Sequence, residues 1–248
     1  MSDDGFFLLF GPPKSGTTFL QRALDLHPRV SCPSEQNLQA ILDNIGDFFD
    51  RYNHMLEVAD RRASGQGVRR VGGTVARDIF AATLTALSAG LAGGKPVHGL
   101  KDNLILNNLP FYLTVFPACP KVCLVRNPVD RAVSIWNANQ QLAAEEPENA
   151  DGHLARLDNP EGTFEGFVEK SVAETAETFR RLARVAADRD DILVTHYEAL
   201  TADRRAGLGR IFGFLGAPTD DATLDTVAAE TAPERMAARS AHPAFFGR

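Results

Sequence analysis

The feature that most constrains the fold is a short apolar run near the start of the chain, which ends in a glycine loop. Residues 6–10 read Phe-Phe-Leu-Leu-Phe, and Gly11-Pro-Pro-Lys-Ser-Gly-Thr-Thr18 follows at once. A continuous apolar run closed by a turn is typical of a strand buried on both faces of a parallel sheet. Residues 18–26 then carry apolar side chains at helical spacing as far as His27-Pro28. We therefore expect a central strand, a loop and a helix in direct succession.

The same alternation continues along the chain. We expect further strands at residues 29–32, 97–101, 121–125 and 192–194, and helices at residues 35–52, 78–91, 104–116, 129–144 and 164–183, with two more after the last strand. Residues 61–73 are predicted to be a loop, and Pro110 is predicted to interrupt its helix. Repeated β-α units indicate an α/β fold with three α/β/α layers and a mostly parallel sheet. We see no repeat or linker and predict one domain over residues 1–248.

The composition excludes several classes of protein. With 44% hydrophobic and 23% charged residues, the chain is expected to be globular rather than disordered or fibrous. The net charge of −6 argues against a surface built to bind nucleic acid, so any anion site must be local. The longest apolar runs are far too short to span a membrane, and no charged-then-apolar leader opens the printed sequence. We therefore expect a cytoplasmic protein.

The three cysteines are too few for a disulfide framework, as expected in a reducing compartment. Cys119 and Cys123 have a spacing compatible with half of a zinc site, and also with two buried thiols. The histidines show no metal-ligand spacing.

The glycine loop is suited to binding a phosphate or a similar anion. Between a buried strand and a helix, backbone N–H groups and the helix N-terminus converge on one point. Lys14 adds a positive charge, and Thr17 and Thr18 add hydroxyl donors. A glycine turn that only joined a strand to a helix would need neither the lysine nor the two threonines.

This loop is not the loop of a nucleoside triphosphatase. That motif, G-x-x-x-x-G-K-[S/T], requires a lysine at position 17, where this chain has Thr17. A magnesium-dependent phosphoryl transferase also usually has an acidic residue at the end of a neighbouring strand, whereas residues 121–125 end in Arg126. An arginine there indicates a second anion site rather than a metal site. If both strands lie side by side, Lys14 and Arg126 bind opposite ends of one ligand at the carboxyl edge of the sheet.

Together these motifs resemble the sulfotransferases that use 3′-phosphoadenosine 5′-phosphosulfate (PAPS) as donor. Pro13-Lys-Ser-Gly-Thr-Thr-Phe-Leu20 is similar to that family's loop for the 5′-phosphosulfate. Arg126-Asn-Pro-Val-Asp-Arg-Ala-Val-Ser134 is similar to its 3′-phosphate site, with arginine and serine eight positions apart. Ile192-Leu-Val-Thr-His-Tyr-Glu-Ala-Leu200 is similar to the segment that borders the adenine, with Tyr197 as the contact.

The resemblance implies a sulfuryl transfer that needs no metal and leaves 3′,5′-adenosine bisphosphate (PAP). Lys14 would stabilise the leaving oxygen, Thr17 and Thr18 would help to hold the 5′-phosphate, and Ser15 and Gly16 would offer backbone N–H groups. Arg126 and Ser134 would bind the 3′-phosphate. The other expected nucleotide contacts are Phe19, which either stacks on the adenine or belongs to the core, and Thr231.

The same resemblance implies two possible kinds of general base. Relatives use either a histidine after a Lys-x-His strand end or a glutamate after the second strand. Here Lys101-Asp102-Asn103 has asparagine in place of the histidine, whereas His27-Pro28 followed by Glu35 resembles the second arrangement. Glu35 is therefore either the base or an N-terminal helix cap. Lys101 is either a second cation at the sulfuryl group or a surface lysine, and His98 should face the opposite side of its strand.

The acceptor side and the C-terminus match the family least. Thr231-Ala-Pro-Glu-Arg-Met236 resembles the segment that leads to a closing loop over the 3′-phosphate, and that loop is expected to be absent or reduced to Arg239 or Arg248. Residues 37–62 and 137–163 are expected to line a pocket for a small-molecule, lipid or carbohydrate acceptor. Two alternatives remain: a catalytically impaired PAPS- or PAP-binding protein, and an atypical P-loop nucleotide kinase. The oligomeric state is left open.

Overall fold

The computed structural model describes residues 5–63, 67–217 and 219–238 of the chain. Its centre is a five-stranded sheet in the order β2-β3-β1-β4-β5, in which every neighbouring pair is parallel. The strands are β1 (Phe6–Phe10), β2 (Val30–Ser31), β3 (Val97–Lys101), β4 (Lys121–Val125) and β5 (Ile192–His196). The predicted central position of the first strand is confirmed.

Helices precede, connect and follow these strands. They are α1 (Thr17–Leu26), α2 (Leu38–Ala63), α3 (Gly73–Leu91), α4 (Leu109–Val115), α5 (Pro128–Glu145), α6 (Ala150–Ala155), α7 (Phe164–Ala186), α8 (Tyr197–Ala202), α9 (Arg204–Phe214), α10 (Asp221–Glu230) and α11 (Pro233–Ala238), with 3₁₀ turns η1 (Asn103–Leu106) and η2 (Pro147–Asn149). No helix in these described ranges combines the length and the apolar composition that crossing a bilayer requires.

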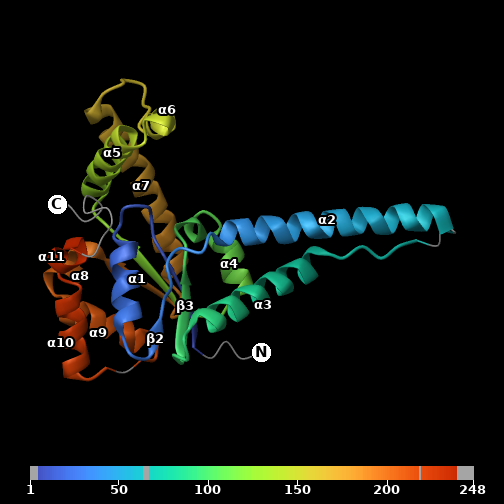
Figure 1. Ribbon diagram of the computed structural model, residues 1–248, viewed down its shortest axis with the longest axis horizontal. Coiled ribbons are helices and arrows are strands. Elements are labelled where there is room, and N and C mark those ends of the chain that lie inside the picture. The colour runs from blue at the N-terminus through green and yellow to red at the C-terminus, as the bar shows by residue number, and fades with distance from the viewer. Residues whose placement is uncertain (1–4, 64–66, 218, 239–248) are drawn as a thin grey trace.

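The sheet is covered on both faces, which gives the predicted three layers (Figure 1). All five side chains of β1 are buried, and they alternate between two apolar clusters. Phe7 and Leu9 pack with side chains of α1, α9 and α10 on one face. Phe6, Leu8 and Phe10 pack with side chains of α3, α4 and α7 on the other. Burial on both faces explains why β1 is apolar at every position.

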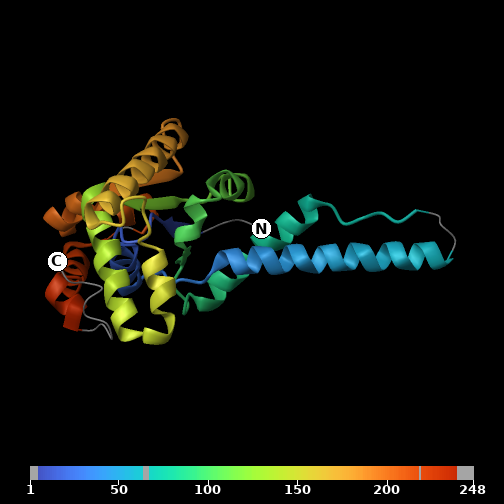
Figure 2. The ribbon, with the colours of Figure 1, turned by 90° about the horizontal axis from the view of Figure 1, so that it is seen from above.

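The longest helix leaves this layered body. Figures 1 and 2 show α2 projecting from the sheet, with the chain returning through an extended stretch and then α3. The prediction of a helix over residues 35–52 is therefore wrong at both ends, and part of the predicted loop at 61–73 is helical. The start is displaced because Asn37 has a left-handed φ of 48°. The Leu38 N–H, at the first position of α2, donates to Asp102 Oδ2 at 2.6 Å.

Two other predicted elements also differ from the structure. Residues 104–116 are divided into η1 and α4, and Pro110 stands in the first turn of α4, where proline is tolerated, rather than interrupting a longer helix. Among the described residues after β5, the chain forms four short helices instead of two. Predictions for β3 and β4 match their observed bounds.

Candidate functional site

The loop between β1 and α1 holds the backbone angles of an anion-binding turn. Lys14 has φ 67° and Gly16 has φ 90°. Gly16 is the N-cap of α1 and has no side chain of its own with which to cap the helix. Alternation of right- and left-handed residues turns successive N–H groups toward one concave point, which favours an anion. The loop therefore has the geometry expected for a bound phosphate.

Arg126 meets this loop from the neighbouring strand. β1 and β4 are paired, so their carboxyl ends lie together at one edge of the sheet. The Arg126 guanidinium donates from Nη1 to the Lys14 carbonyl at 3.3 Å. Burial, and then the nearby charge of Arg126, lower the pKa of Lys14. Two cationic side chains, which follow two paired strands, thus lie near one partly buried corner at the edge of the sheet.

Two buried polar atoms in this corner have no hydrogen-bond partner among the residues that the structure describes. They are Ser15 Oγ and Arg126 Nε. Leaving a buried donor unpaired costs free energy, about 1–3 kcal/mol each. Because both atoms belong to the predicted phosphate sites, the residues present fit a ligand that accepts hydrogen bonds here.

Tyr197 lies against both Arg126 and Gly16 of the loop. Tyr197 is the first residue of α8. Its ring faces Arg126, and the Arg126 guanidinium carbon lies 4.9 Å from the centre of the ring. A Cβ on Gly16 would lie 2.4 Å from the Tyr197 ring, so only glycine allows this approach. The Asn127 N–H donates to Glu198 Oε1 at 2.7 Å, which ties the end of β4 to α8. Tyr197 therefore positions the loop and Arg126 directly.

Arg131 is a contact that the sequence analysis did not assign. From α5 its Nε donates to the Pro13 carbonyl at 2.9 Å, and its Nη1 donates to Thr175 Oγ1 of α7 at 2.7 Å. Burial lowers the pKa of Arg131, and the carboxylate of Glu174 opposes that effect. Arg131 thus braces the loop against α7. Its place five residues after Arg126, inside the same matched segment, was the available signal.

A chain of polar contacts connects the candidate base, Glu35, to the same loop. Glu35 Oε2 is 2.7 Å from Lys101 Nζ, and Glu35 Oε1 accepts the Asn103 N–H at 3.3 Å. Thr17 Oγ1 donates to Asn103 Oδ1 at 3.1 Å. Asn103, at the position that a histidine occupies in some relatives, therefore joins the phosphate loop to Glu35.

The structure excludes one of the two predicted roles of Glu35, that of a helix cap, and one of the two of Lys101, that of a surface lysine. Glu35 precedes α2 by three residues and does not cap it, since Asp102 accepts the Leu38 N–H. The side chain of Lys101 is 5% exposed, so the interpretation as a surface lysine is wrong. His98 lies on the other side of β3, where its Nδ1 is 3.0 Å from Ser88 Oγ of α3. That placement confirms the predicted alternation along β3.

The remaining predicted contacts are placed less favourably for a nucleotide. Phe19 is 7% exposed, with its ring edge-on to Tyr197 at 6.1 Å, so most of it belongs to the core. Thr231 is fully buried and donates its hydroxyl to the Val227 carbonyl. Thr18 is exposed in the first turn of α1, and Ser134 is half-buried one helical turn beyond Arg131. Arg239 and Arg248 lie outside the described residues.

His27, part of the matched His-Pro segment, has a structural position. It is buried at the end of α1, where Nδ1 accepts the Arg29 N–H and Nε2 lies 3.2 Å from Thr219 Oγ1. Cys119 and Cys123 are both buried, and neither forms a disulfide within the described residues. Within the described ranges, no three His, Cys, Asp or Glu side chains are grouped as metal ligands.

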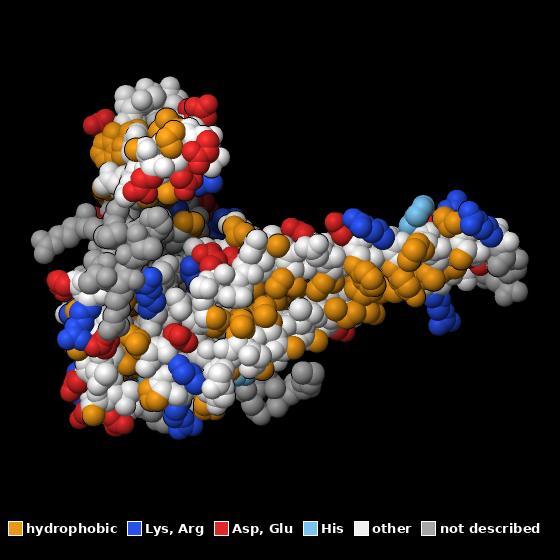
Figure 3. Space-filling model, viewed as in Figure 1, with side chains coloured by type: hydrophobic (Ala, Val, Ile, Leu, Met, Phe, Trp, Pro, Cys, Tyr) orange, Lys and Arg blue, Asp and Glu red, His pale blue; other side chains and the backbone are white. Residues whose placement is uncertain are grey.

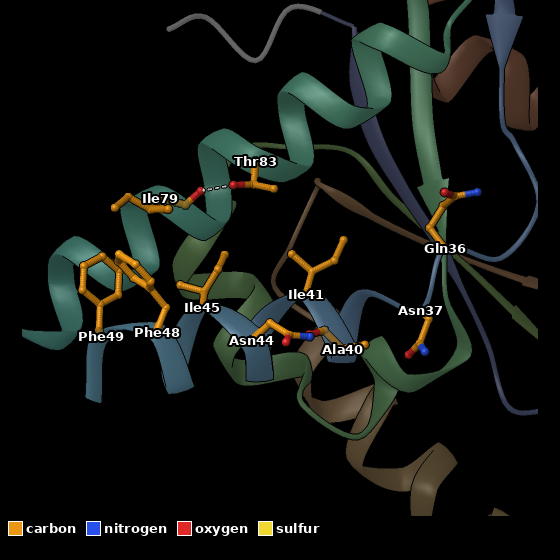
Figure 4. A pocket seen from close by; sticks show the side chains of 10 residues that line it. All are labelled: Gln36, Asn37, Ala40, Ile41, Asn44, Ile45, Phe48, Phe49, Ile79 and Thr83. Carbon is orange, nitrogen blue, oxygen red and sulfur yellow. Dashed lines mark hydrogen bonds between the residues drawn. The ribbon is translucent and has the colours of Figure 1, made fainter. Parts of the chain in front are cut away.

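A groove opens next to the candidate base. It has a volume of about 480 Å³ and lies between α2 and α3, as Figure 4 shows. Gln36 and Asn37, which follow Glu35 in the chain, form its inner end, and Ile45, Phe48 and Ile79 line its outer part. Of the two predicted acceptor segments, the first half of residues 37–62 lines this groove, whereas no residue of 137–163 does, so the prediction of one pocket formed by both segments is wrong for this groove.

Comparisons with known proteins agree with this arrangement. Residues 7–221 match a family model described as "Sulfotransferase family". A search of curated proteins finds no match.

Several solved structures share the fold. A mouse sulfotransferase, SULT7A1, complexed with PAP superposes with a TM-score of 0.55 at 18% identity, over 96% of this chain and 67% of that one. A sulfotransferase from Alicyclobacillus acidocaldarius gives 0.51 at 19% identity, over 96% of each chain. The sulfotransferase domain of the Synechococcus PCC 7002 olefin synthase gives 0.53 at 21% identity, over 97% of this chain and 84% of that one. With the family model matching most of its length, the chain belongs to the sulfotransferase family.

Proposed function

We propose that the protein transfers a sulfuryl group from PAPS to a hydroxyl or amine of a small-molecule, lipid or carbohydrate acceptor. The observation that carries the proposal is the meeting of Lys14 and Arg126 at the ends of two paired strands. A nucleoside with an anionic group at each end needs two separated cationic sites at one sheet edge. PAPS has this pattern of charge, and the mouse relative was solved with PAP.

In this proposal the phosphate loop holds the 5′ end of the donor. The N–H groups around Ser15 and Gly16, the Ser15 hydroxyl and Lys14 would bind the 5′-phosphosulfate. Ser15 Oγ is a buried atom that this ligand would satisfy. Arg126 and Ser134 would bind the 3′-phosphate, which would satisfy Arg126 Nε. Lys14 would stabilise negative charge on the leaving phosphate oxygen.

The transfer itself breaks the bond between sulfur and the phosphate oxygen and forms a bond from sulfur to the acceptor oxygen or nitrogen. The electron pair of the broken bond stays with PAP, and the acceptor proton passes to Glu35. Glu35 is suited to this role because its carboxylate is 45% exposed and is held by Lys101 and by the Asn103 N–H, and the next two residues of the chain line the groove. Lys101 supplies a buried positive charge next to the reacting groups.

The proposal is tested by titrating PAP calorimetrically in the presence of a metal chelator. We expect micromolar affinity, on the order of −8 kcal/mol. Lys14→Ala and Arg126→Ala should each weaken binding at least tenfold. Arg205→Ala is the matched control, because this exposed arginine of α9 pairs with Asp221 and Asp225 away from the sheet edge.

Three other outcomes would contradict part of the proposal or favour an alternative function. Unchanged PAP affinity in Arg126→Ala would remove the proposed 3′ site. Tight binding of ATP with Mg²⁺, together with no binding of PAP, would favour a nucleotide kinase. Tight PAP binding without sulfuryl transfer to any acceptor would favour the catalytically impaired nucleotide-binding protein.

A further inference from the structure

The strongest unexplained feature outside the site is the projecting segment formed by α2, residues 67–72 and the first turns of α3, here called the arm. Figure 3 shows apolar side chains gathered along the arm for most of its length. The most exposed are Phe48 at 60%, Met55 at 61% and Val75 at 46%. Monomeric proteins rarely leave such a continuous apolar stripe in water, and where they do it usually marks an interface.

The apolar residues of α2 follow a heptad rather than a simple amphipathic pattern. Their spacing alternates between three and four residues along one line, here called the seam: Ile41, Ile45, Phe48, Tyr52, Met55 and Ala59. Spacing of this kind is the signature of a helix that packs against a second helix. The next positions, Leu42, Phe49 and Leu56, are buried or half-buried within the chain's own fold. Of the seam, Phe48, Tyr52, Met55 and Ala59 remain exposed after the chain has folded, whereas Ile41 and Ile45 are partly buried against the chain's own core.

Along the outer part of the arm, no helix of the described chain packs against the seam. Near the body, α3 lies beside α2, but further out the returning chain is the extended stretch 67–72, as Figure 1 shows. That stretch is bound to α2 by Asn53, which pairs through its side chain with the backbone of Val71, and by the ion pair between Arg70 and Glu57. Most of the stability of a helix in a protein comes from the packing of its apolar face. A partner helix on the seam would complete the packing.

Charge along the arm indicates which partner this is. The inner half of α2 carries three aspartates and no basic residue: Asp43, Asp47 and Asp50. The outer end, residues 57–72, carries four arginines against two acidic residues: Arg61, Arg62, Arg69 and Arg70 against Glu57 and Asp60. Two copies packed antiparallel bring each basic outer end to the acidic inner half of the other. A parallel pair would place like charges together.

We propose that the protein forms a homodimer in which the α2 seams of two copies pack antiparallel. The heptad fixes the register, since Phe48 then faces Tyr52 of the second copy, Ile45 faces Met55 and Ile41 faces Ala59. Met55 of the second copy then packs on Ile45 and Phe48 in the outer part of the groove between α2 and α3, and the inner end at Gln36 and Asn37 stays open for an acceptor (Figure 4). The basic outer end of each arm then lies at the first turn of the other α2, which begins three residues after Glu35. This inference does not depend on the proposed reaction.

The test is the mass of the full chain in solution, measured by sedimentation velocity and light scattering between 1 and 100 μM. We expect twice the chain mass of 26.9 kDa. The double variant Phe48→Ser, Met55→Ser should be monomeric, with an unchanged far-ultraviolet signal from the body. Leu154→Ser is the matched control, because Leu154 is 41% exposed on α6, and it should stay dimeric. Raised salt should weaken the dimer, since opposite charges meet across it.

Cysteine crosslinking tests the orientation, because the native cysteines are buried. An equimolar mixture of Ile45→Cys and Met55→Cys chains should crosslink between unlike chains. Met55→Cys alone should not crosslink. A wild-type monomer at 100 μM, whether or not it binds lipid vesicles, would overturn the proposal. So would a dimer that survives the double seam substitution, or self-crosslinking of Met55→Cys.

Discussion

At the scale of single residues, the site is built from backbone angles that side chains ordinarily avoid. Among the described residues, the non-glycine residues with positive φ are Lys14 and Asn37. One shapes the phosphate loop, and the other directs the chain from Glu35 into α2. Such angles cost about 1 kcal/mol or more each, and they persist where the surroundings enforce them. One of these angles shapes the turn that would bind the donor's phosphate, and the other follows the carboxylate of the proposed base.

Gly16 gives the first prediction at this scale. Gly16→Ala must hold a φ of 90° and place a methyl group 2.4 Å from the Tyr197 ring. We expect the free energy of unfolding to fall by about 2 kcal/mol and PAP binding to weaken at least tenfold. Gly46→Ala is the matched control, because its added methyl meets no atom within 4 Å. It should stabilise α2 by about 0.5–1 kcal/mol. Equal effects of the two substitutions in urea unfolding would contradict this account.

Glu35 gives the second prediction. Glu35→Gln keeps the size of the side chain and its acceptor toward the Asn103 N–H, but removes the proton acceptor. We expect PAP affinity to stay within threefold and transfer from PAPS to aliphatic alcohols to fall at least 100-fold. Transfer to p-nitrophenol, which is largely ionised above neutral pH, should fall much less. Glu169→Gln, an exposed residue of α7, serves as the control. Undiminished transfer to alcohols in Glu35→Gln would assign the base elsewhere.

At the scale of elements, the carboxylate of Asp102, directly after β3, determines where α2 and η1 begin. Asp102 is 1% exposed, and its two oxygens accept the N–H groups of Leu38 and Leu104 at 2.6 and 2.7 Å. It therefore starts α2 and η1 together and places the turn that carries Glu35. Asp102→Ala leaves two helix starts without their acceptor. We expect a loss of about 3 kcal/mol in urea unfolding.

Asp203→Ala is the comparison for this prediction. Asp203 caps α9 through the Ala206 N–H in an exposed position, so its loss should be smaller. Asp102→Ala should also shift the far-ultraviolet signal, because the first turns of α2 lose their anchor. If both substitutions cost the same and the signal is unchanged, Asp102 has no special part in starting α2.

The same contact explains what the sequence could and could not predict. The strands and the glycine loop follow from local patterns, because apolar runs and glycine turns act over a few residues. The start of α2 depends on Asp102, 64 positions away, so its first residue could not be read locally. The brace from Arg131 to Pro13 is equally long-range. The heptad of α2 was visible in the sequence, but only the structure shows that its seam is unpaired.

At the scale of the whole molecule, the two ends of the sheet have different tasks. The carboxyl end carries the candidate site. At the amino end of β4, Lys121 is fully buried and donates to the Phe116 and Cys119 carbonyls, both at 2.6 Å, and to Asp191 at 2.8 Å. Arg189 binds the same carboxylate. The ion pair of Lys121 with Asp191 links the start of β4 to the turn before β5. It thereby stabilises β4, the strand that Arg126 follows.

The charge of Asp191 predicts how stability depends on pH. Burial opposes its ionisation, but hydrogen bonds from Arg189 and Lys121 outweigh that effect and lower the pKa to about 2, from an ordinary value of 3.8. Because the folded pKa is the lower one, this contribution is complete above about pH 4 and is lost as the pH falls toward 2. Asp191→Asn should be less stable at pH 7, with a shallower loss between pH 4 and 2, measured by urea unfolding. An identical slope in wild type and variant would exclude Asp191 as its source.

The central claim, that Lys14 and Arg126 read opposite ends of one adenosine, is tested most directly by a cycle of two ligands and two proteins. PAP and 5′-AMP, which lacks the 3′-phosphate, are each titrated into the wild type and into Arg126→Ala without divalent metal. We predict that the wild type prefers PAP at least tenfold, and that Arg126→Ala binds the two nucleotides within threefold of each other. A preference for PAP that is retained in Arg126→Ala would contradict the account.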